Sequence, residues 1–230
     1  MDHSAACPPL RYTPRVLDFR YITFEGPPGV GKTALAERLA ARLDATLVLE
    51  ETENPFLSDF YAGRAGAALQ SQLYFLLSRH RQQSAARQAD LFRQLTICDY
   101  LFEKDKIYAY LNLDDNELFI YQRLYDLLAR QVVAPDLVVY LQAPVDLLVR
   151  RLKDQRRAGD QELPALDPAY VRELCQGYQH FFFHYAATPL LVVETSQLDL
   201  ADDDEALDDL AKQIASMGRG TRYYVPRTGP

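Results

Sequence analysis

The chain has 230 residues, of which 48% are hydrophobic and 25% are charged, and its formal net charge is −7. This composition is that of one globular domain and excludes a disordered or membrane-embedded chain. The negative charge argues against binding of polymeric nucleic acid, which depends on Lys and Arg. No apolar run approaches the roughly 18 residues of a membrane-spanning helix, and residues 1–10 lack the pattern of a secretory signal. We therefore expect a cytoplasmic protein that acts on small molecules and does not contact a membrane.

Five short apolar runs, rich in residues that favour strands, alternate along the chain with segments of helical periodicity. The predicted strands cover residues 21–25, 46–50, 95–99, 137–142 and 190–194, and the predicted helices cover residues 34–43, 66–89, 114–131 and 146–157. Such alternation is typical of β-α-β units. We expect an α/β fold of three layers, in which a five-stranded parallel sheet is flanked by helices.

The two ends of the chain have little periodic pattern, and residues 20–215 contain all of the predicted elements. We expect residues 1–19 to form a loose N-terminal extension and residues 216–230 to form a loose C-terminal tail. The three cysteines, Cys7, Cys98 and Cys175, are widely spaced. This spacing indicates reduced thiols rather than a disulfide framework or a zinc site.

A glycine-rich segment follows the first predicted strand and precedes the first predicted helix. It matches the pattern G-x-x-x-x-G-K-[ST] and reads Gly26-Pro27-Pro28-Gly29-Val30-Gly31-Lys32-Thr33. Its glycines allow backbone N–H groups to turn inward around phosphates, and the following helix adds the positive end of its dipole. We expect this phosphate loop, or P-loop, to bind ATP, with Lys32 on the β- and γ-phosphates and the Thr33 hydroxyl on Mg²⁺.

Carboxylates stand at the ends of the second and third predicted strands. The carboxyl ends of parallel strands face the ligand crevice, so Glu50, Glu51 or Glu53 can act as a general base toward an acceptor hydroxyl. The alternative is a solvated acidic loop. Asp99 ends the third strand beside the P-loop, where a Mg²⁺ ligand is usually supplied. For Asp99 the alternative is a cap of the next segment.

Basic residues are concentrated in and after the predicted helix 146–157. Arg151, Arg156 and Arg157 can fold over a triphosphate as a lid, because planar guanidinium groups offset the charge of a transferring phosphoryl group. The alternative is a solvated helix face, which charge runs usually form. We favour the lid because this segment follows a P-loop in the same chain.

Four further segments are more specific than the P-loop: residues 50–56 (EETENPF), 59–61 (DFY), 70–79 (QSQLYFLLSR) and 99–105 (DYLFEKD). With the arginine-rich segment, they resemble the bacterial deoxynucleoside kinases of the deoxyadenosine/deoxyguanosine kinase type, which are relatives of the deoxycytidine kinases. The resemblance covers roughly residues 20–214. It implies a kinase that transfers the γ-phosphate of ATP to the 5′-hydroxyl of a deoxynucleoside, with a purine deoxynucleoside as the expected acceptor. It also implies a homodimer.

The resemblance further implies roles for residues on the acceptor side. Glu50 matches the glutamate that serves as base for the 5′-hydroxyl, with Glu51 as the fallback. Gln72 and Arg79 match the pair that contacts the nucleobase, and Asp105 matches the acid that supports this pair. Gln72 and Arg79 are seven residues apart, which places both on one face of a helix. The alternative is that this face is solvated.

The sugar contacts complete the implied site, and two departures from the family pattern accompany them. Tyr61 matches a tyrosine that hydrogen-bonds the sugar 3′-hydroxyl, and Glu162 is a looser match to its acidic partner. Many members have an acid-Arg-Ser triplet where this chain has Asp99-Tyr100-Leu101, so an arginine near the transferred phosphate is missing. The chain also lacks tryptophan, where relatives often stack a Trp near the site.

Two other functions remain open from the sequence. A nucleoside-monophosphate kinase of the thymidylate type would share the P-loop and the lid. It would need cations that grip an acceptor phosphate, whereas the acceptor side here offers the carboxylate of Glu50. A non-catalytic nucleotide-binding protein could keep a P-loop without turnover, but the intact set of Lys32, Thr33, Glu50 and Asp99 argues against it.

Overall fold

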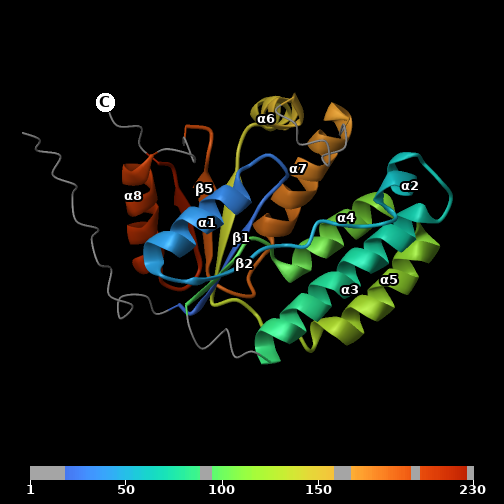
Figure 1. Ribbon diagram of the computed structural model, residues 1–230, viewed down its shortest axis with the longest axis horizontal. Coiled ribbons are helices and arrows are strands. Elements are labelled where there is room, and N and C mark those ends of the chain that lie inside the picture. Colours follow the sequence, from blue (N-terminus) through green and yellow to red (C-terminus); the bar gives the residue numbers. More distant parts are fainter. Residues whose placement is uncertain (1–18, 89–94, 158–166, 198–202, 227–230) are drawn as a thin grey trace, which may run out of the picture.

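A parallel sheet of six strands forms the centre of the molecule (Figure 1). The computed structural model describes residues 19–88, 95–157, 167–197 and 203–226. The strand order is β2-β3-β1-β4-β5-β6. The five predicted strands are all present, although β2 and β3 are shorter than expected. The bounds are β1 (Tyr21–Glu25), β2 (Thr46–Val48), β3 (Thr96–Cys98), β4 (Leu137–Gln142), β5 (Leu190–Glu194) and β6 (Thr221–Tyr224).

The sixth strand corrects two predictions. The sheet has six strands instead of five. Residues 216–230 are not a loose tail throughout, because β6 lies within them. It pairs in parallel with β5, and Leu190 aligns with Thr221. As an edge strand it leaves alternate side chains exposed, with Tyr223 at 73%. It therefore lacks the continuous apolar run by which buried parallel strands are recognised. Residues 1–18 of the expected N-terminal extension lie outside the described residues.

The four predicted helices are present and begin and end close to the predicted positions, and the chain forms further helices that the sequence analysis does not predict. α5 begins after Asp114, whose carboxylate accepts the N–H groups of Asn116 and Glu117 in a capping box. None of the helices in the described part of the chain combines the length and the apolar character that crossing a membrane requires. The bounds are α1 (Lys32–Leu43), α2 (Leu57–Tyr61), α3 (Ala67–Gln88), the 3₁₀ turn η3 (Phe102–Lys104), α4 (Asp105–Asn112), α5 (Asp115–Ala129), α6 (Val145–Arg157), α7 (Pro168–Phe183) and α8 (Asp204–Ala215).

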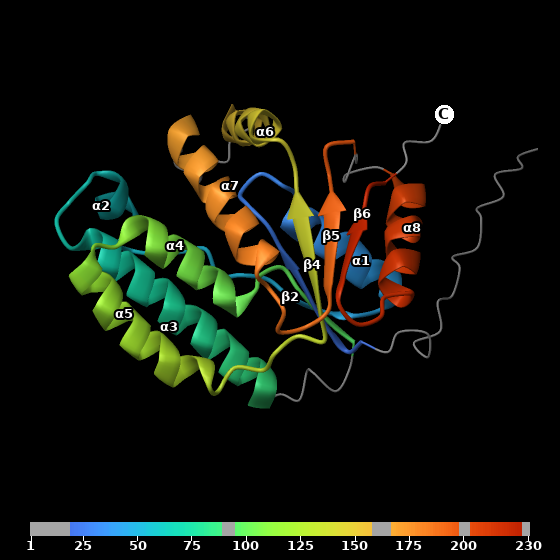
Figure 2. The same cartoon turned by 180° about the vertical axis from the view of Figure 1, so that it is seen from behind.

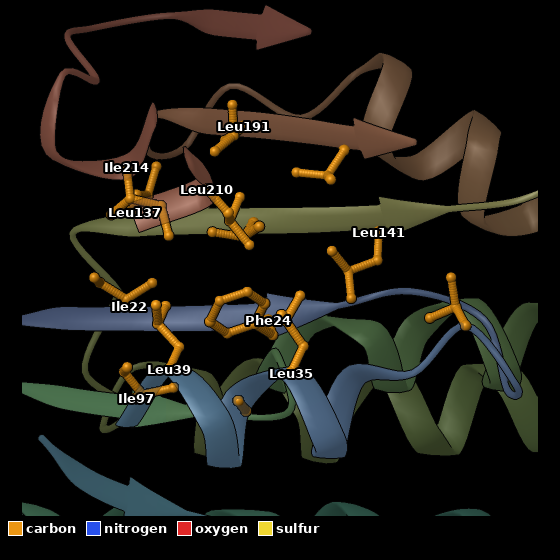
Figure 3. Close-up of a cluster of buried hydrophobic side chains, with 14 of the residues drawn as sticks. Ile22, Phe24, Leu35, Leu39, Ile97, Leu137, Leu141, Leu191, Leu210 and Ile214 are labelled. Carbon is orange, nitrogen blue, oxygen red and sulfur yellow. The ribbon is translucent and has the colours of Figure 1, made fainter. Parts of the chain in front are cut away.

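Side chains that alternate along the strands build a core on each face of the sheet, which gives the expected three layers. In β4, Val139 and Leu141 pack with α1 and α8, whereas Val138 and Tyr140 pack with α4 and α7. Figure 3 shows part of the first core, in which Phe24 of β1 lies among aliphatic side chains of the neighbouring elements. The period of two that places these residues on opposite faces is the one expected of strands buried on both sides.

The helices α3, α4 and α5 lie side by side, away from α1 and α8 (Figures 1 and 2). Leu76, Tyr121 and Tyr125 belong to the apolar core between α3 and α5. Buried polar groups need hydrogen-bond partners, so the polar side of α3 must be satisfied by the segments that it faces. Five polar residues of α3 are buried: Ser71, Gln72, Ser78, Arg79 and Gln83.

Candidate active site

Three loops that carry predicted site residues leave the sheet at the same edge. Thr23 of β1 and Val48 of β2 both align with Cys98 of β3. The P-loop, Glu50 and Asp99 therefore follow the carboxyl ends of adjacent strands. This is the edge at which open parallel sheets bind their ligands.

The P-loop has the backbone of an anion-binding turn. Gly29 and Gly31 have φ angles of 79° and 94°, in the left-handed region that favours glycine. A Cβ atom at Gly29 would lie 3.0 Å from the side chain of Leu152 and 3.2 Å from the carbonyl oxygen of Leu148. α1 begins at Lys32, and the first N–H groups of a helix, which lack intrahelical partners, attract anions. Geometry and electrostatics both fit a phosphate group here.

The ammonium of Lys32 lies within the P-loop. It donates to the carbonyl oxygens of Gly26, at 2.6 Å, and of Pro27, at 3.4 Å. Burial lowers the pKa of Lys32, nearby carboxylates oppose this shift, and Lys104 adds to it. Charged phosphate oxygens bind an ammonium more strongly than neutral carbonyls do. The Lys32 ammonium can therefore exchange these two carbonyl partners for the phosphate oxygens of a triphosphate.

Asp99 joins the P-loop to the neighbouring strand. The Thr33 hydroxyl donates to Asp99 Oδ2 at 2.6 Å, and the backbone N–H of Glu50 donates to Asp99 Oδ1 at 2.7 Å. A hydroxyl and a carboxylate in contact suit Mg²⁺, which takes oxygen ligands and leaves most positions to water and substrate phosphates. Within the described ranges there is no group of three or more His, Cys, Asp or Glu side chains that could hold a metal alone.

Glu50 lies between two cations. Its Oε1 accepts a hydrogen bond from Arg79 Nε at 2.8 Å, and its Oε2 is paired with the ammonium of Lys104. Burial alone would raise the pKa of the Glu50 carboxyl, but Lys104 and Arg79 outweigh this effect and hold the pKa at about 2. The carboxylate is therefore ionised at neutral pH and able to accept a hydrogen bond from a hydroxyl group.

Asp105 is the centre of a second buried cluster, which is linked to the first through Arg79. Its Oδ1 is paired with Arg79 and accepts from Gln72 Nε2 at 2.8 Å, and its Oδ2 accepts from the Tyr121 hydroxyl at 3.0 Å. Burial raises the pKa of the Asp105 carboxyl, and these three partners oppose that shift. The three residues that the resemblance assigns to the base, Gln72, Arg79 and Asp105, are thus brought into contact.

Two other predicted residues, Glu51 and Tyr61, make different contacts. Glu51, the fallback base, accepts from the Ser78 hydroxyl at 2.6 Å and so turns toward α3, whereas Glu50 contacts both cations. Tyr61 ends α2 and is 44% exposed. Partial burial, together with the neighbouring Tyr170, raises the pKa of Tyr61 to about 12, so its phenol remains a hydrogen-bond donor at neutral pH.

The three arginines of the expected lid lie on α6 in different surroundings. Arg151 donates to the carbonyl oxygen of Thr195, just after β5, at 3.1 Å. Arg156 and Arg157 are exposed near the end of the helix, and Arg157 lies 3.8 Å from Asp154. The helix is where the sequence predicts it, and closure of this segment over a triphosphate stays a prediction. Glu162 lies outside the described residues.

A family model described as "Deoxynucleoside kinase" matches residues 22–218. The chain belongs to this family. Deoxynucleoside kinases are phosphotransferases that act on a hydroxyl group, so this chain is an enzyme with an alcohol group as its acceptor. The matched residues include the P-loop, both buried clusters and α6.

Three similar proteins set this deoxynucleoside kinase in context. The deoxyguanosine kinase of Bacillus subtilis is 29% identical over 161 residues, which cover 69% of this chain and 76% of that one. The deoxyadenosine/deoxycytidine kinase of the same organism is 27% identical over 206 residues, which cover 85% and 92%. A solved structure of deoxyadenosine kinase from M. mycoides matches with a TM-score of 0.69 and 21% identity, over 85% of this chain and 99% of that one. This last likeness shows the shared fold.

Two buried charged residues of this deoxynucleoside kinase have no role in the sequence-based prediction. One is Lys104, which contacts Glu50. The other is Glu25, which accepts the backbone N–H of Gly26 at 2.7 Å and that of Leu101 at 2.8 Å. Glu25 follows the apolar run of residues 21–24, whereas Lys104 lies in the charged stretch 103–106. A signal was therefore available for Glu25 alone, because a charged residue that ends a buried strand must be paired.

Proposed function

We propose that this deoxynucleoside kinase transfers the γ-phosphate of ATP to the 5′-hydroxyl of a purine deoxynucleoside, deoxyadenosine or deoxyguanosine. The observation that carries the proposal is the ionised carboxylate of Glu50, whose backbone is joined through Asp99 to Thr33 of the P-loop. A carboxylate on the acceptor side accepts a hydrogen bond from a neutral hydroxyl and repels the phosphate of a monophosphate. This favours a nucleoside acceptor over the acceptor of a thymidylate-type kinase.

On the donor side, the P-loop N–H groups and Lys32 would hold the triphosphate. Arg151, Arg156 and Arg157 would offset the charge of the transferring phosphoryl group and exclude water. Thr33 and Asp99 would hold Mg²⁺. When bound, Mg²⁺ supplies positive charge that neutralises the phosphate oxygens.

On the acceptor side, Glu50 would accept a hydrogen bond from the 5′-hydroxyl and take up its proton. With a pKa of about 2, this carboxylate is a weak base. A weak base suits a loose transition state, in which little bond to the attacking oxygen has formed when the barrier is crossed. Its main contribution is then to orient the hydroxyl for in-line attack. Tyr61 and Glu162 would bind the sugar 3′-hydroxyl.

The base would contact Gln72 and Arg79, supported by Asp105. Because Gln72 Nε2 donates to Asp105, the amide oxygen of Gln72 is the atom that can meet the base, and this oxygen accepts from an exocyclic amino group. Adenine, guanine and cytosine carry such a group, and guanine and thymine also offer a ring N–H to the same oxygen. The names of both Bacillus relatives include a purine deoxynucleoside. We therefore expect the purine deoxynucleosides to be the best acceptors.

The test is transfer of radiolabelled phosphate from Mg-ATP to each of the four deoxynucleosides and to their monophosphates. Glu50→Gln is the inactive variant, and Glu51→Gln is its matched control, because the neighbouring carboxylate faces Ser78 instead. We expect transfer to deoxyadenosine or deoxyguanosine. Loss of general-base and orienting functions should lower kcat of Glu50→Gln by about 10²-fold or more, while Glu51→Gln stays within a few-fold of the wild type.

Each other outcome rejects part of the proposal. Transfer to a monophosphate alone would assign the chain to the thymidylate-type reaction. Binding of ATP without transfer to any acceptor would indicate a non-catalytic nucleotide-binding protein. A greater loss in Glu51→Gln than in Glu50→Gln would exchange the roles of the two carboxylates.

The homodimer implied by the resemblance belongs to the same proposal. Large apolar side chains are exposed on both long helices, Leu77 on α3 at 49%, and Ile120 and Leu127 on α5 at 53% and 61%. Ile120 and Leu127 are seven residues apart and share a helix face, and exposed apolar patches mark interaction sites. Light scattering should give the mass of a dimer for the wild type and that of a monomer for Leu127→Glu. A monomeric wild type would refute the proposed dimer.

The expected cytoplasmic location is likewise a proposal, which cell fractionation tests.

A further inference from the structure

The turn η3 carries a buried lysine with no assigned role. The side chain of Lys104 is 5% exposed, and its ammonium is paired with the carboxylate of Glu50. Lysine is almost never this deeply buried, because its ammonium loses its hydration. The resemblance described above implies an arginine in this region, at the position of Tyr100. The structure therefore raises the question of which cation this chain uses.

Position 100 cannot supply a cation to the site. The side chain of Tyr100 is fully buried and packs with Tyr21 and Cys98 under α3. Its hydroxyl accepts from Gln83 Nε2 at 3.3 Å. This aromatic residue is part of the apolar core, so the chain must bring positive charge to Glu50 from elsewhere.

The backbone of η3 is fixed so that Lys104 provides this charge. The N–H of Leu101 donates to Glu25 Oε2 at 2.8 Å, and the N–H of Lys104 donates to the carbonyl oxygen of Leu101 at 3.1 Å. Glu25 also accepts the N–H of Gly26, the first residue of the P-loop, at 2.7 Å. The same buried carboxylate therefore anchors the turn that carries Lys104 and the loop that would hold the phosphates.

The two cations that contact Glu50 differ in how their charge is used. Arg79 holds Glu50 Oε1 but is also paired with Asp105, so its charge is shared between two carboxylates. Lys104 holds Oε2.

We propose that Lys104 is a positioning residue for phosphoryl transfer, which holds the Glu50 carboxylate directed toward the acceptor hydroxyl in place of the arginine that the chain lacks at position 100. This inference rests on the proposed function, because it assigns Glu50 to the acceptor hydroxyl. Lys104 acts through Glu50, so its removal affects catalysis only while Glu50 is present.

The test is a double-mutant cycle in kcat with Lys104→Met, Glu50→Gln and the double variant, using Mg-ATP and the best deoxynucleoside acceptor. Loss of one preorganised charged contact at a reacting centre lowers rates by about 10²-fold, and we expect a loss of this size in Lys104→Met. The KM for ATP should change by less than about threefold, since the P-loop is untouched. In the Glu50→Gln background the same substitution should lower kcat by less than about threefold, because residues that act as one unit are not additive.

Two further variants separate the charge of Lys104 from its packing. Lys104→Arg keeps the charge and should retain kcat within about tenfold of the wild type. Lys106→Met is the matched control, since Lys106 lies two residues away with its ammonium over the Tyr125 ring at 4.3 Å, and it should behave as wild type. Binding of ATP and a thermal melt of each variant establish that the protein is folded. Should Lys104→Met fail to fold, Lys104→Gln replaces it in the same cycle.

The outcomes distinguish this inference from the proposed function. An inactive wild type refutes the proposed function itself. An active wild type with a normal kcat in Lys104→Met refutes the inference alone. So does a cycle in which the losses of Lys104→Met and Glu50→Gln multiply, because the two residues would then act independently.

Discussion

Glu50→Gln should make the stability of this deoxynucleoside kinase less sensitive to acid. The pKa of Glu50 is about 2 in the folded protein, against an ordinary value of 4.5. Because the folded pKa is the lower one, ionisation of Glu50 stabilises the fold. This contribution is fully present above pH 4.5 and is lost as the pH falls toward 2. The shift corresponds to about 3 kcal/mol, of which about 0.8 kcal/mol is lost by pH 4 and about 1.4 kcal/mol by pH 3.5.

Urea unfolding followed by circular dichroism measures this effect. The free energy of unfolding of the wild type and of Glu50→Gln is determined at pH 7, 4 and 3.5. The carboxylates away from Arg79 and Lys104 titrate alike in both proteins, so the difference between the two reports Glu50 together with the cluster that it shares with Asp105. We expect the free energy of unfolding of the wild type, relative to that of Glu50→Gln, to fall by about 0.8 kcal/mol between pH 7 and pH 4 and by about 1.4 kcal/mol between pH 7 and pH 3.5. Two stability curves that stay parallel between pH 7 and 3.5 would refute the reasoning, because they would mean that Arg79 and Lys104 do not hold the carboxylate ionised.

Three further substitutions test particular contacts. Glu25→Gln places an amide group against a backbone N–H, and the resulting unsatisfied donors should destabilise the fold by about 1–3 kcal/mol in urea unfolding; an unchanged midpoint would contradict the buried hydrogen bonds. Gly29→Ala should weaken ATP binding more than tenfold in calorimetry, because its Cβ would meet α6. The matched Gly63→Ala, also at a positive φ but with no atom within 4 Å of the added Cβ, should leave binding unchanged, and equal losses would refute the steric argument. Tyr121→Phe removes a donor to the carboxylate beneath the base and should raise the KM of the deoxynucleoside several-fold with the KM for ATP constant; the reverse pattern would count against a base-side role.

The features that the sequence predicts well are those fixed by local pattern. The P-loop could be assigned because its glycines, its lysine and its threonine are consecutive, and the strand before it and the helix after it give it the expected backbone. The bounds of β1, β4 and β5 agree with the prediction, since strands buried on both faces are continuous apolar runs. The start of α5 could be predicted from the acids at its N-terminus, because capping is a contact between near neighbours.

What the sequence could not supply are contacts between distant segments. β6 is stabilised by pairing with β5 rather than by an apolar run of its own, so its pattern resembles a loop. The contact of Lys104 with Glu50 spans 54 positions and depends on how η3 is anchored. Gln72, Arg79 and Asp105 could be grouped only by resemblance, because helical spacing fixes the face of α3 but not the segment that it meets.

Two buried carboxylates determine how the donor and acceptor halves of the site are held together. Asp99 binds the Thr33 hydroxyl on one side and the backbone of Glu50 on the other. Glu25 binds the start of the P-loop and the start of the segment that leads to Lys104. Each link connects neighbouring strands at the carboxyl edge of the sheet, so the separation of the P-loop from Glu50 is set by the strand spacing of a rigid sheet. Positioning of reactants is a large part of catalysis in phosphoryl transfer. It follows that the distance across which the phosphoryl group travels is built into β1, β2 and β3, so that the proposed lid on α6 would be left with access and charge alone.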